Sequence, residues 1–169
     1  MDRIEGFNSL PAGKLEAELL AVCAAPAWGR AVAALRPYPS KEAVMAAADA
    51  AARSLSWPDV LQGLSAHPRI GQRAQGDSTQ ATWSRREQST AASSGDDDTK
   101  AALTAANHAY EDKFGHVFLI FASGRTQEEI VAAARERIGN DEGTERAIVT
   151  DELRKIALLR LERLLDALG

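Results

Sequence analysis

Apolar residues recur along most of the chain at the three- and four-residue spacing of an α-helix. After Pro11, leucines and a valine follow this spacing, and a proline suits the first turn of a helix. The next apolar stretch predicts a short helix from Ala27 to Leu35, which Pro37 and Pro39 end because proline cannot continue a helix. Ser40 then stands where an N-cap is expected for the alanine-rich stretch that follows.

Another helix start is marked by Ser56, with Pro58 and Asp59 directly behind it. The short helix that begins there is expected to end at a hexapeptide, Ala-His-Pro-Arg-Ile-Gly, at residues 66–71. The stretch 71–80 that follows is polar and contains glycine, so it predicts a long surface loop.

The second half of the chain predicts further helices over residues 82–92, 99–114, 127–138 and 141–168. Thr126 and Glu129 form a capping box for the helix at 127–138, and a polar loop is expected over residues 93–98. Residues 117–122, Val-Phe-Leu-Ile-Phe-Ala, form the one β-like run, and a single run cannot build a sheet. The pattern therefore predicts an all-α, single-domain bundle of about eight helices with one short buried extended segment.

The amino-acid composition supports an all-α fold and argues against some classes of function. The 169 residues suffice for one domain, 1–169, and a chain with 45 % hydrophobic but only 5 % aromatic residues, rich in alanine, favours helices over a β-sandwich. The net charge of −4 gives no basic field for nucleic acid or for an anionic membrane. No apolar run reaches the length of a membrane span and the start lacks a signal peptide, so a cytoplasmic protein is expected.

The single cysteine, Cys23, excludes an intrachain disulfide and a zinc cluster built on cysteines. It lies in the apolar stretch Leu-Leu-Ala-Val-Cys-Ala-Ala, where we interpret it as a small buried residue.

His67, in the hexapeptide, is the first candidate for chemistry. Pro68 restricts the backbone of the residue before it to extended conformations, and Gly71 permits a turn shortly after. A histidine fixed in this way by its backbone suits a general acid or base. The alternative interpretation is a histidine that caps a helix near the negative end of its dipole.

A second candidate cluster lies in the predicted helix 82–92. Ser84, Glu87 and Gln88 are spaced i, i+3 and i+4, which places a hydroxyl, a carboxylate and an amide on one helix face. Such an array suits a ligand rich in oxygen and nitrogen. The alternative is a solvated polar face, an interpretation that Arg85, Arg86 and Gln88 also fit.

A third candidate follows the apolar run, which leads to Ser123, Gly124 and Arg125 just before the capped helix. Backbone N–H groups and a guanidinium at such a place are able to bind a carboxylate. The alternative is a buried strand followed by a loop whose arginine points into water.

Three motifs in order carry a family resemblance: His67-Pro68-Arg69-Ile70-Gly71, then Trp83-Ser84-Arg85-x-Glu87-Gln88, then Asn107-x-x-Tyr110-x-x-Lys113-Phe114-Gly115. This ordered set resembles the OHCU decarboxylases of the uric-acid degradation pathway. The stretches 121–130 and 137–145, the start Phe-Asn-Ser-Leu-Pro and the leucine-rich final helix also look like this family, so nearly the whole chain is covered.

The resemblance implies an all-helical enzyme that needs no cofactor or metal and usually forms a homodimer. Its substrate would be 2-oxo-4-hydroxy-4-carboxy-5-ureidoimidazoline, and its products (S)-allantoin and carbon dioxide. By position, His67 would be the catalytic acid or base, with Glu87 beside it. The implied substrate contacts are Pro68, Ser84, Arg85, Arg86, Glu87, Gln88, Leu119, Ile120, Phe121, Ala122, Ser123 and, as the candidate cation, Arg125.

Two functions of other classes stay open. A metal-dependent hydrolase would draw its ligands from His67, His108 and His116 together with Glu87 or Glu111. The spacing of His108 and Glu111 suits a metal on one helix face, although no third ligand stands at a matching spacing. A non-enzymatic helical adaptor would use the hexapeptide only as a turn.

Overall fold

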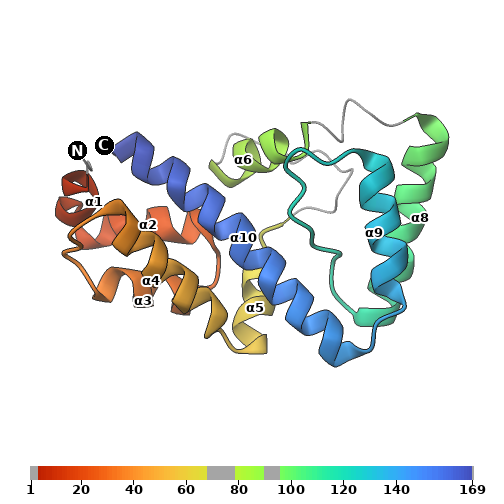
Figure 1. Cartoon of the computed structure of the whole chain (residues 1–169), viewed down its shortest axis with the longest axis horizontal. Helices are drawn as coiled ribbons and strands as arrows, with labels where there is room; N and C mark the ends of the chain where they lie inside the picture. Colours follow the sequence, from red (N-terminus) through yellow and green to blue (C-terminus); the bar gives the residue numbers. More distant parts are fainter. Residues whose placement is uncertain (1–3, 68–78, 90–95, 169) are drawn as a thin grey trace. The chain divides into compact units, whose positions relative to one another are not determined.

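Helices form nearly all of the regular structure of the chain (Figure 1). The computed structural model describes residues 4–67, 79–89 and 96–168, and it contains no β-strand within these ranges. The prediction of an all-α fold is therefore confirmed. The helices are α1 (Glu5–Ser9), α2 (Ala12–Val22), α3 (Pro26–Ala34), α4 (Lys41–Arg53), α5 (Trp57–Leu64), α6 (Thr79–Glu87), α8 (Asp97–Phe114), α9 (Gln127–Ile138) and α10 (Glu142–Leu168).

The predicted helix starts are confirmed by their caps. The hydroxyl of Ser40 accepts a hydrogen bond from the backbone N–H of Ala43, and the hydroxyl of Ser56 accepts one from Asp59. Thr126 forms both halves of the predicted capping box with Glu129. These side chains satisfy N–H groups that the first turn of a helix leaves without a partner.

Four details differ from the predicted pattern. The loop predicted over 93–98 is wrong at its end, since α8 already begins at Asp97; residues 93–95 lie outside the described residues. Helix α1 was not predicted, because its five residues are too few to show a helical period. The loop predicted over 71–80 is wrong at its end, since α6 already begins at Thr79; residues 71–78 lie outside the described residues. Helix α6 ends at Glu87, so Gln88 lies in a turn beyond the predicted helical face.

The chain divides into two compact units. One comprises Met1–Ser65 and Leu153–Gly169, and the other comprises Ala66–Glu152. Helix α10 therefore contributes its first turns to the second unit and its later turns to the first. The predicted single domain over 1–169 stays a prediction.

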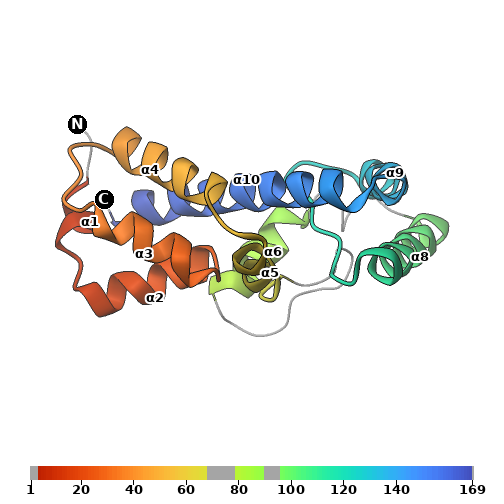
Figure 2. The same ribbon diagram turned by 90° about the horizontal axis from the view of Figure 1, so that it is seen from below.

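In the first unit, α3 packs against both α2 and α4 (Figure 2). Trp28 of α3 is fully buried, and its indole N–H donates a hydrogen bond to the carbonyl of Ala48 at 3.0 Å. Gly29 permits the close approach of α2, because a Cβ at this position would lie 3.3 Å from the Cβ of Leu19. Cys23 is buried here as predicted, and burial raises the pKa of its thiol.

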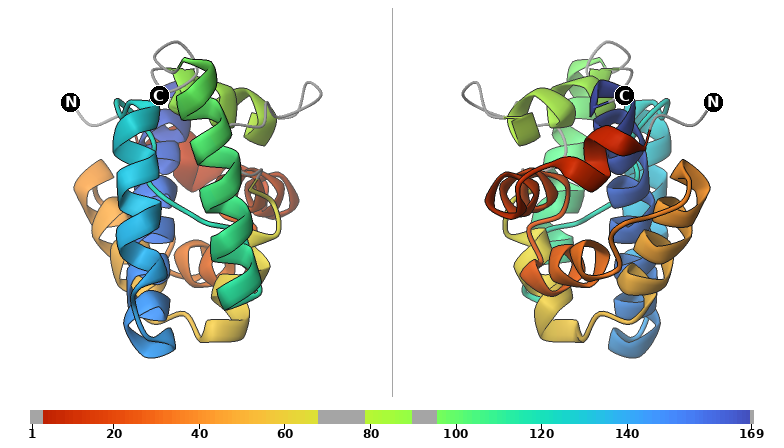
Figure 3. Two further views of the ribbon diagram at one scale, coloured as in Figure 1. Left: turned by 90° about the vertical axis from the view of Figure 1, so that its right-hand side faces the viewer. Right: turned by 90° about the vertical axis from the view of Figure 1, so that its left-hand side faces the viewer.

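In the second unit, α8 and α9 lie side by side (Figure 3), and the connection between them carries the apolar run 117–122. Gly115 ends α8 with φ of 79°, a backbone conformation that glycine adopts without strain. The buried core shared by both helices and this connection consists of Leu103, Ala106, Tyr110, Phe118, Ile120, Ala122, Ile130, Val131 and Ala134. The predicted burial of the run is confirmed, and it forms no strand.

No helix among residues 4–67, 79–89 and 96–168 combines the length and the apolar character that crossing a membrane requires.

Candidate functional site

His67 lies three residues after the end of α5 and is half-buried. The preceding helix is well capped, since Ser65 donates its backbone N–H to the carbonyls of Leu61 and Gln62. His67 therefore lies just beyond a defined helix end, as the sequence predicted. Pro68, the neighbour that restricts His67, lies outside the described residues, as does Gly71.

The residues from Ser84 to Gln88 occupy the last turn of α6 and the turn after it. Glu87 is buried, with 6 % of its surface exposed, whereas Arg86 is exposed. Arg85 is half-buried and approaches the hydroxyl of Thr82 at 3.4 Å. The interpretation of this stretch as a uniformly solvated face is wrong for Glu87, because a solvated carboxylate would not be buried. The side chain of Ser84 lies outside the described part of the molecule.

The segment 119–123 is mostly buried. Leu119, Ile120 and Ala122 are each at most 4 % exposed, while Phe121 and Ser123 are half-buried. This alternation leaves two side chains of the segment within reach of solvent. Ile120 and Ala122 thereby belong to the core of the second unit.

Arg125 turns back onto this segment. Its Nε donates a hydrogen bond to the carbonyl of Phe121 at 3.0 Å, and its backbone N–H donates one to the carbonyl of Ala122 at 3.0 Å. The interpretation of Arg125 as an arginine that points freely into water is therefore wrong. Part of its guanidinium is engaged in fixing the backbone.

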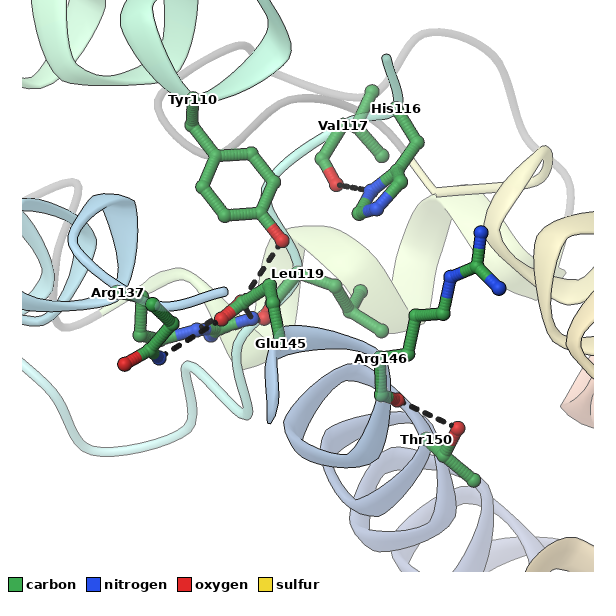
Figure 4. Close-up of polar contacts among 9 residues, drawn as sticks. Tyr110, His116, Val117, Leu119, Arg137, Glu145, Arg146 and Thr150 are labelled. Atoms are coloured by element: carbon green, nitrogen blue, oxygen red, sulfur yellow. Dashed lines mark hydrogen bonds and ion pairs between the residues drawn. The ribbon is translucent and has the colours of Figure 1, made fainter. Parts of the chain in front are cut away.

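A buried polar cluster holds the segment from its other end (Figure 4). Arg137 donates from Nη1 to the carbonyl of Leu119 at 2.7 Å and from Nε to Oε1 of Glu145 at 2.6 Å. The same carboxylate oxygen accepts a hydrogen bond from the hydroxyl of Tyr110 at 2.9 Å, and Oε2 accepts one from Nδ2 of Asn140 at 3.2 Å. We call Tyr110, Arg137, Asn140 and Glu145 the Glu145 network.

The Glu145 network is charged and nearly dry. Glu145 is 1 % exposed and Arg137 is 7 % exposed, so both charged groups are shielded from solvent. Their ion pair and their hydrogen bonds compensate for the lost hydration. Burial, together with the neighbouring carboxylate of Glu145, raises the pKa of Tyr110, which keeps its hydroxyl protonated and able to donate. The guanidinium of Arg137 also lies over the ring of Phe118, 4.6 Å from its centre.

Lys113 ties α8 to the end of α9. Its ammonium donates a hydrogen bond to the carbonyl of Asn140 at 2.8 Å and another to the carbonyl of Ile138. The motifs around Tyr110 and from Arg137 to Glu145 therefore meet in space. Sequence reasoning took them only as marks of a family and missed this role. The opposite charges of Arg137 and Glu145 on both sides of Gly139 are a sequence signal for their own ion pair alone, because nothing near them points to Tyr110 or Leu119.

The two remaining histidines differ in their surroundings. His116 packs against the rings of Tyr110 and Phe114, and its Nδ1 lies 3.0 Å from the carbonyl of Val117. His108 is exposed on α8. Across the described ranges, no group of three or more histidine, cysteine, aspartate or glutamate side chains is arranged to hold a metal ion.

The fold and the site define a class of all-helical proteins that presents a histidine after a short helix and a buried carboxylate at the end of another. The family model for OHCU decarboxylase matches residues 8–162, and the chain belongs to this family. The resemblance predicted from the ordered motifs is thereby confirmed.

Individual relatives agree with this assignment. The chain is 34 % identical over 152 residues to the uric acid degradation bifunctional protein TTL of Arabidopsis thaliana, covering 88 % of this chain and 47 % of the relative. It is 29 % identical over 127 residues to the 2-oxo-4-hydroxy-4-carboxy-5-ureidoimidazoline decarboxylase of Haloferax volcanii, covering 75 % of this chain and 73 % of the relative. The chain thus spans about half the length of the Arabidopsis relative.

Solved structures show the same fold. A crystal structure of OHCU decarboxylase in the presence of (S)-allantoin is similar with a TM-score of 0.73 and 32 % identity, covering 88 % of this chain and 97 % of that one. A crystal structure of (S)-allantoin synthase, 20 % identical with a TM-score of 0.71 over 95 % of this chain and 53 % of that one, shares the fold.

Proposed function

We propose that this protein is a carboxy-lyase that converts 2-oxo-4-hydroxy-4-carboxy-5-ureidoimidazoline to (S)-allantoin and carbon dioxide. The observation that carries the proposal is membership of the OHCU decarboxylase family over residues 8–162, a range that includes every proposed site residue. The burial of Glu87 supports it, because a functional carboxylate needs a site that excludes much of the water.

The reaction itself explains how such a site works without a cofactor. Loss of carbon dioxide leaves an electron pair, and a conjugated C=N bond in the substrate's own ring is able to accept it. The protein then has to hold the carboxylate out of the plane of the ring, stabilise the developing charge and direct a proton to one face. Protonation of one face alone gives the (S) product.

Within this proposal, His67 acts as the acid or base that transfers the proton of the substrate hydroxyl, and it thereby assists the loss of carbon dioxide. Glu87 orients His67 and stabilises the positive charge that the imidazole carries once it has taken up a proton. Ser84, Gln88 and the backbone of 119–123 hold the polar atoms of the ring and of the ureido group. Arg125, whose Nε holds the carbonyl of Phe121, offers its terminal nitrogens to the substrate carboxylate.

We also propose that the protein acts in the cytoplasm as a homodimer, as the family resemblance implies. Sedimentation equilibrium over a range of concentrations tests the dimer. A monomer at all concentrations would contradict it.

Circular dichroism at wavelengths where allantoin absorbs tests the activity directly. Urate is oxidised and hydrolysed in the cuvette to give fresh substrate, and the protein is then added. We expect rapid growth of the (S)-allantoin signal, whereas an unaccelerated decay to racemic product would reject the enzyme and favour the adaptor.

The same assay after exhaustive chelation separates the decarboxylase from the metal-dependent hydrolase. Unchanged turnover, with no metal found by elemental analysis, is the expected result. Loss of activity that a divalent metal restores would favour the hydrolase.

A further inference from the structure

We propose that the Glu145 network positions the peptide unit between Leu119 and Ile120 for contact with the substrate. Arg137 and Glu145 are then positioning residues that act through the backbone of 119–123 and do not touch the substrate themselves. This inference rests on the proposed decarboxylase function, and it gives a purpose to charged residues that lie in the core of the second unit.

The planarity of the peptide bond couples the orientation of the carbonyl of Leu119 to that of the N–H of Ile120. The carbonyl of Leu119 and the N–H of Ile120 belong to one trans peptide unit, so the two groups point in opposite directions. Nη1 of Arg137 holds that carbonyl at 2.7 Å. Fixing the carbonyl toward Arg137 therefore aims the N–H of Ile120 away from the Glu145 network, at a defined angle.

Arg125 fixes the following peptide units in the same way. Its Nε holds the carbonyl of Phe121 at 3.0 Å and so directs the N–H of Ala122 away from the guanidinium, while its backbone N–H holds the carbonyl of Ala122 at 3.0 Å. The side chains of two arginines thus fix the peptide units that begin at Leu119 and at Phe121. Donors that are fixed before the substrate arrives lose no freedom when it binds, which favours both binding and catalysis.

The chemistry of arginine suits this task. Its guanidinium is a rigid planar fork, so Nε is able to engage Glu145 while Nη1 engages Leu119. Glu145, held also by Tyr110, prevents the fork from rotating. A core made of apolar residues would be as stable as a buried ion pair or more so, but it would not fix a carbonyl. We therefore assign to the buried charges of Arg137 and Glu145 the role of fixing the carbonyl of Leu119.

Arg137→Lys is the informative variant, because lysine keeps the charge but cannot form both bonds in one plane. The matched control is Arg154→Lys, which makes the same change in the ion pair of Arg154 with Asp49, 2.8 Å apart in the first unit. Initial rates are measured over a range of substrate concentrations, well below the melting temperature of each variant. For Arg137→Lys we expect kcat/KM to fall roughly 10- to 100-fold, mainly through a higher KM. The control keeps the KM of the wild type.

A purely structural role makes a different prediction. Loss of folded protein lowers the apparent kcat in proportion to the folded fraction and leaves KM unchanged. Arg137→Lys with a wild-type KM would therefore overturn the inference while the proposed function stands. If the wild-type chain fails to accelerate (S)-allantoin formation, both are overturned together.

Tyr110→Phe provides a second, milder variant that keeps the ring contacts and removes only the hydrogen bond to Glu145. It is expected to raise KM in the same direction by a smaller factor. Amide NMR adds a readout that does not depend on turnover: (S)-allantoin should shift the Ile120 amide resonance in the wild type, and the shift should weaken in Arg137→Lys. An equal shift in both proteins would contradict the inference.

Discussion

Asn8 and Tyr38 exchange two hydrogen bonds across the first unit. Nδ2 of Asn8 donates to the carbonyl of Tyr38 at 2.9 Å, and Oδ1 of Asn8 accepts from the backbone N–H of Tyr38 at 2.8 Å. One side chain thus satisfies both backbone groups of a residue in the connection between α3 and α4. The polar side chain of Asn8, in the stretch Phe-Asn-Ser-Leu-Pro, therefore serves the fold by holding this connection in place.

Replacing Asn8 by alanine should destabilise the protein without affecting its site. The partly buried carbonyl and N–H of Tyr38 would both lose their partner, and the free energy of unfolding should fall by about 1–3 kcal/mol. Urea unfolding followed by circular dichroism measures this. Ser9→Ala is the matched control, because it removes one exposed bond to the carbonyl of Glu5 and should change little. Equal effects of both variants would show that the paired bonds contribute nothing special.

His67→Asn should abolish most of the enantioselective formation of allantoin. General acid–base catalysis by a positioned side chain contributes about 100- to 10,000-fold in rate, and asparagine cannot exchange a proton near neutral pH. The circular dichroism assay measures the loss, and the far-ultraviolet spectrum should show unchanged helical content. His108→Asn, on an exposed position of α8, should keep full activity. Full activity in His67→Asn would remove His67 from the mechanism.

Glu87→Gln tests the buried carboxylate with almost no change in shape. If the charge of Glu87 assists His67, we expect kcat to fall by about 100-fold, because the amide no longer stabilises the protonated imidazole. Glu128→Gln, an exposed residue on α9, is the control and should behave as the wild type. A wild-type kcat in Glu87→Gln would leave the carboxylate with a structural role alone.

Much of the fold was predictable because local signals decide it. Ser40, Ser56, Thr126 and Gly115 each mark a helix end through contacts within one turn, and such contacts can be recognised from neighbouring residues alone. Helix α1 escaped prediction because it is too short to show a period.

The Glu145 network was not predictable from the same signals. Tyr110 lies 35 residues before Glu145, and Leu119 lies 18 residues before Arg137, so no local pattern joins them. The motifs resembled those of a family, but only the tertiary structure shows that Tyr110 of α8 and Arg137 of α9 share the carboxylate of Glu145 at the start of α10. The exposure of Arg86 and the burial of Glu87, neighbours in the sequence, likewise depend on tertiary packing.

Acid stability gives a prediction for the start of α8. Asp96 accepts a hydrogen bond from the backbone N–H of Thr99 at 2.8 Å, and this bond lowers the pKa of the carboxyl below its ordinary value of 3.8. A group with a lowered pKa in the folded state stabilises the fold above its ordinary pKa, and the contribution is lost as the pH falls through the folded value. Asp96→Asn keeps the cap and removes this titration.

We therefore expect Asp96→Asn to melt at nearly the wild-type temperature at pH 7 and to lose less stability than the wild type below about pH 3.8. Asp96→Ala separates the cap from the charge, because alanine removes the hydrogen bond at every pH and should lower the melting temperature already at pH 7. Thermal melts at several pH values between neutral and acid measure both effects. Parallel pH dependence of the wild type and Asp96→Asn would mean that the charge of Asp96 does not contribute to folding, and that only its hydrogen bond to Thr99 does.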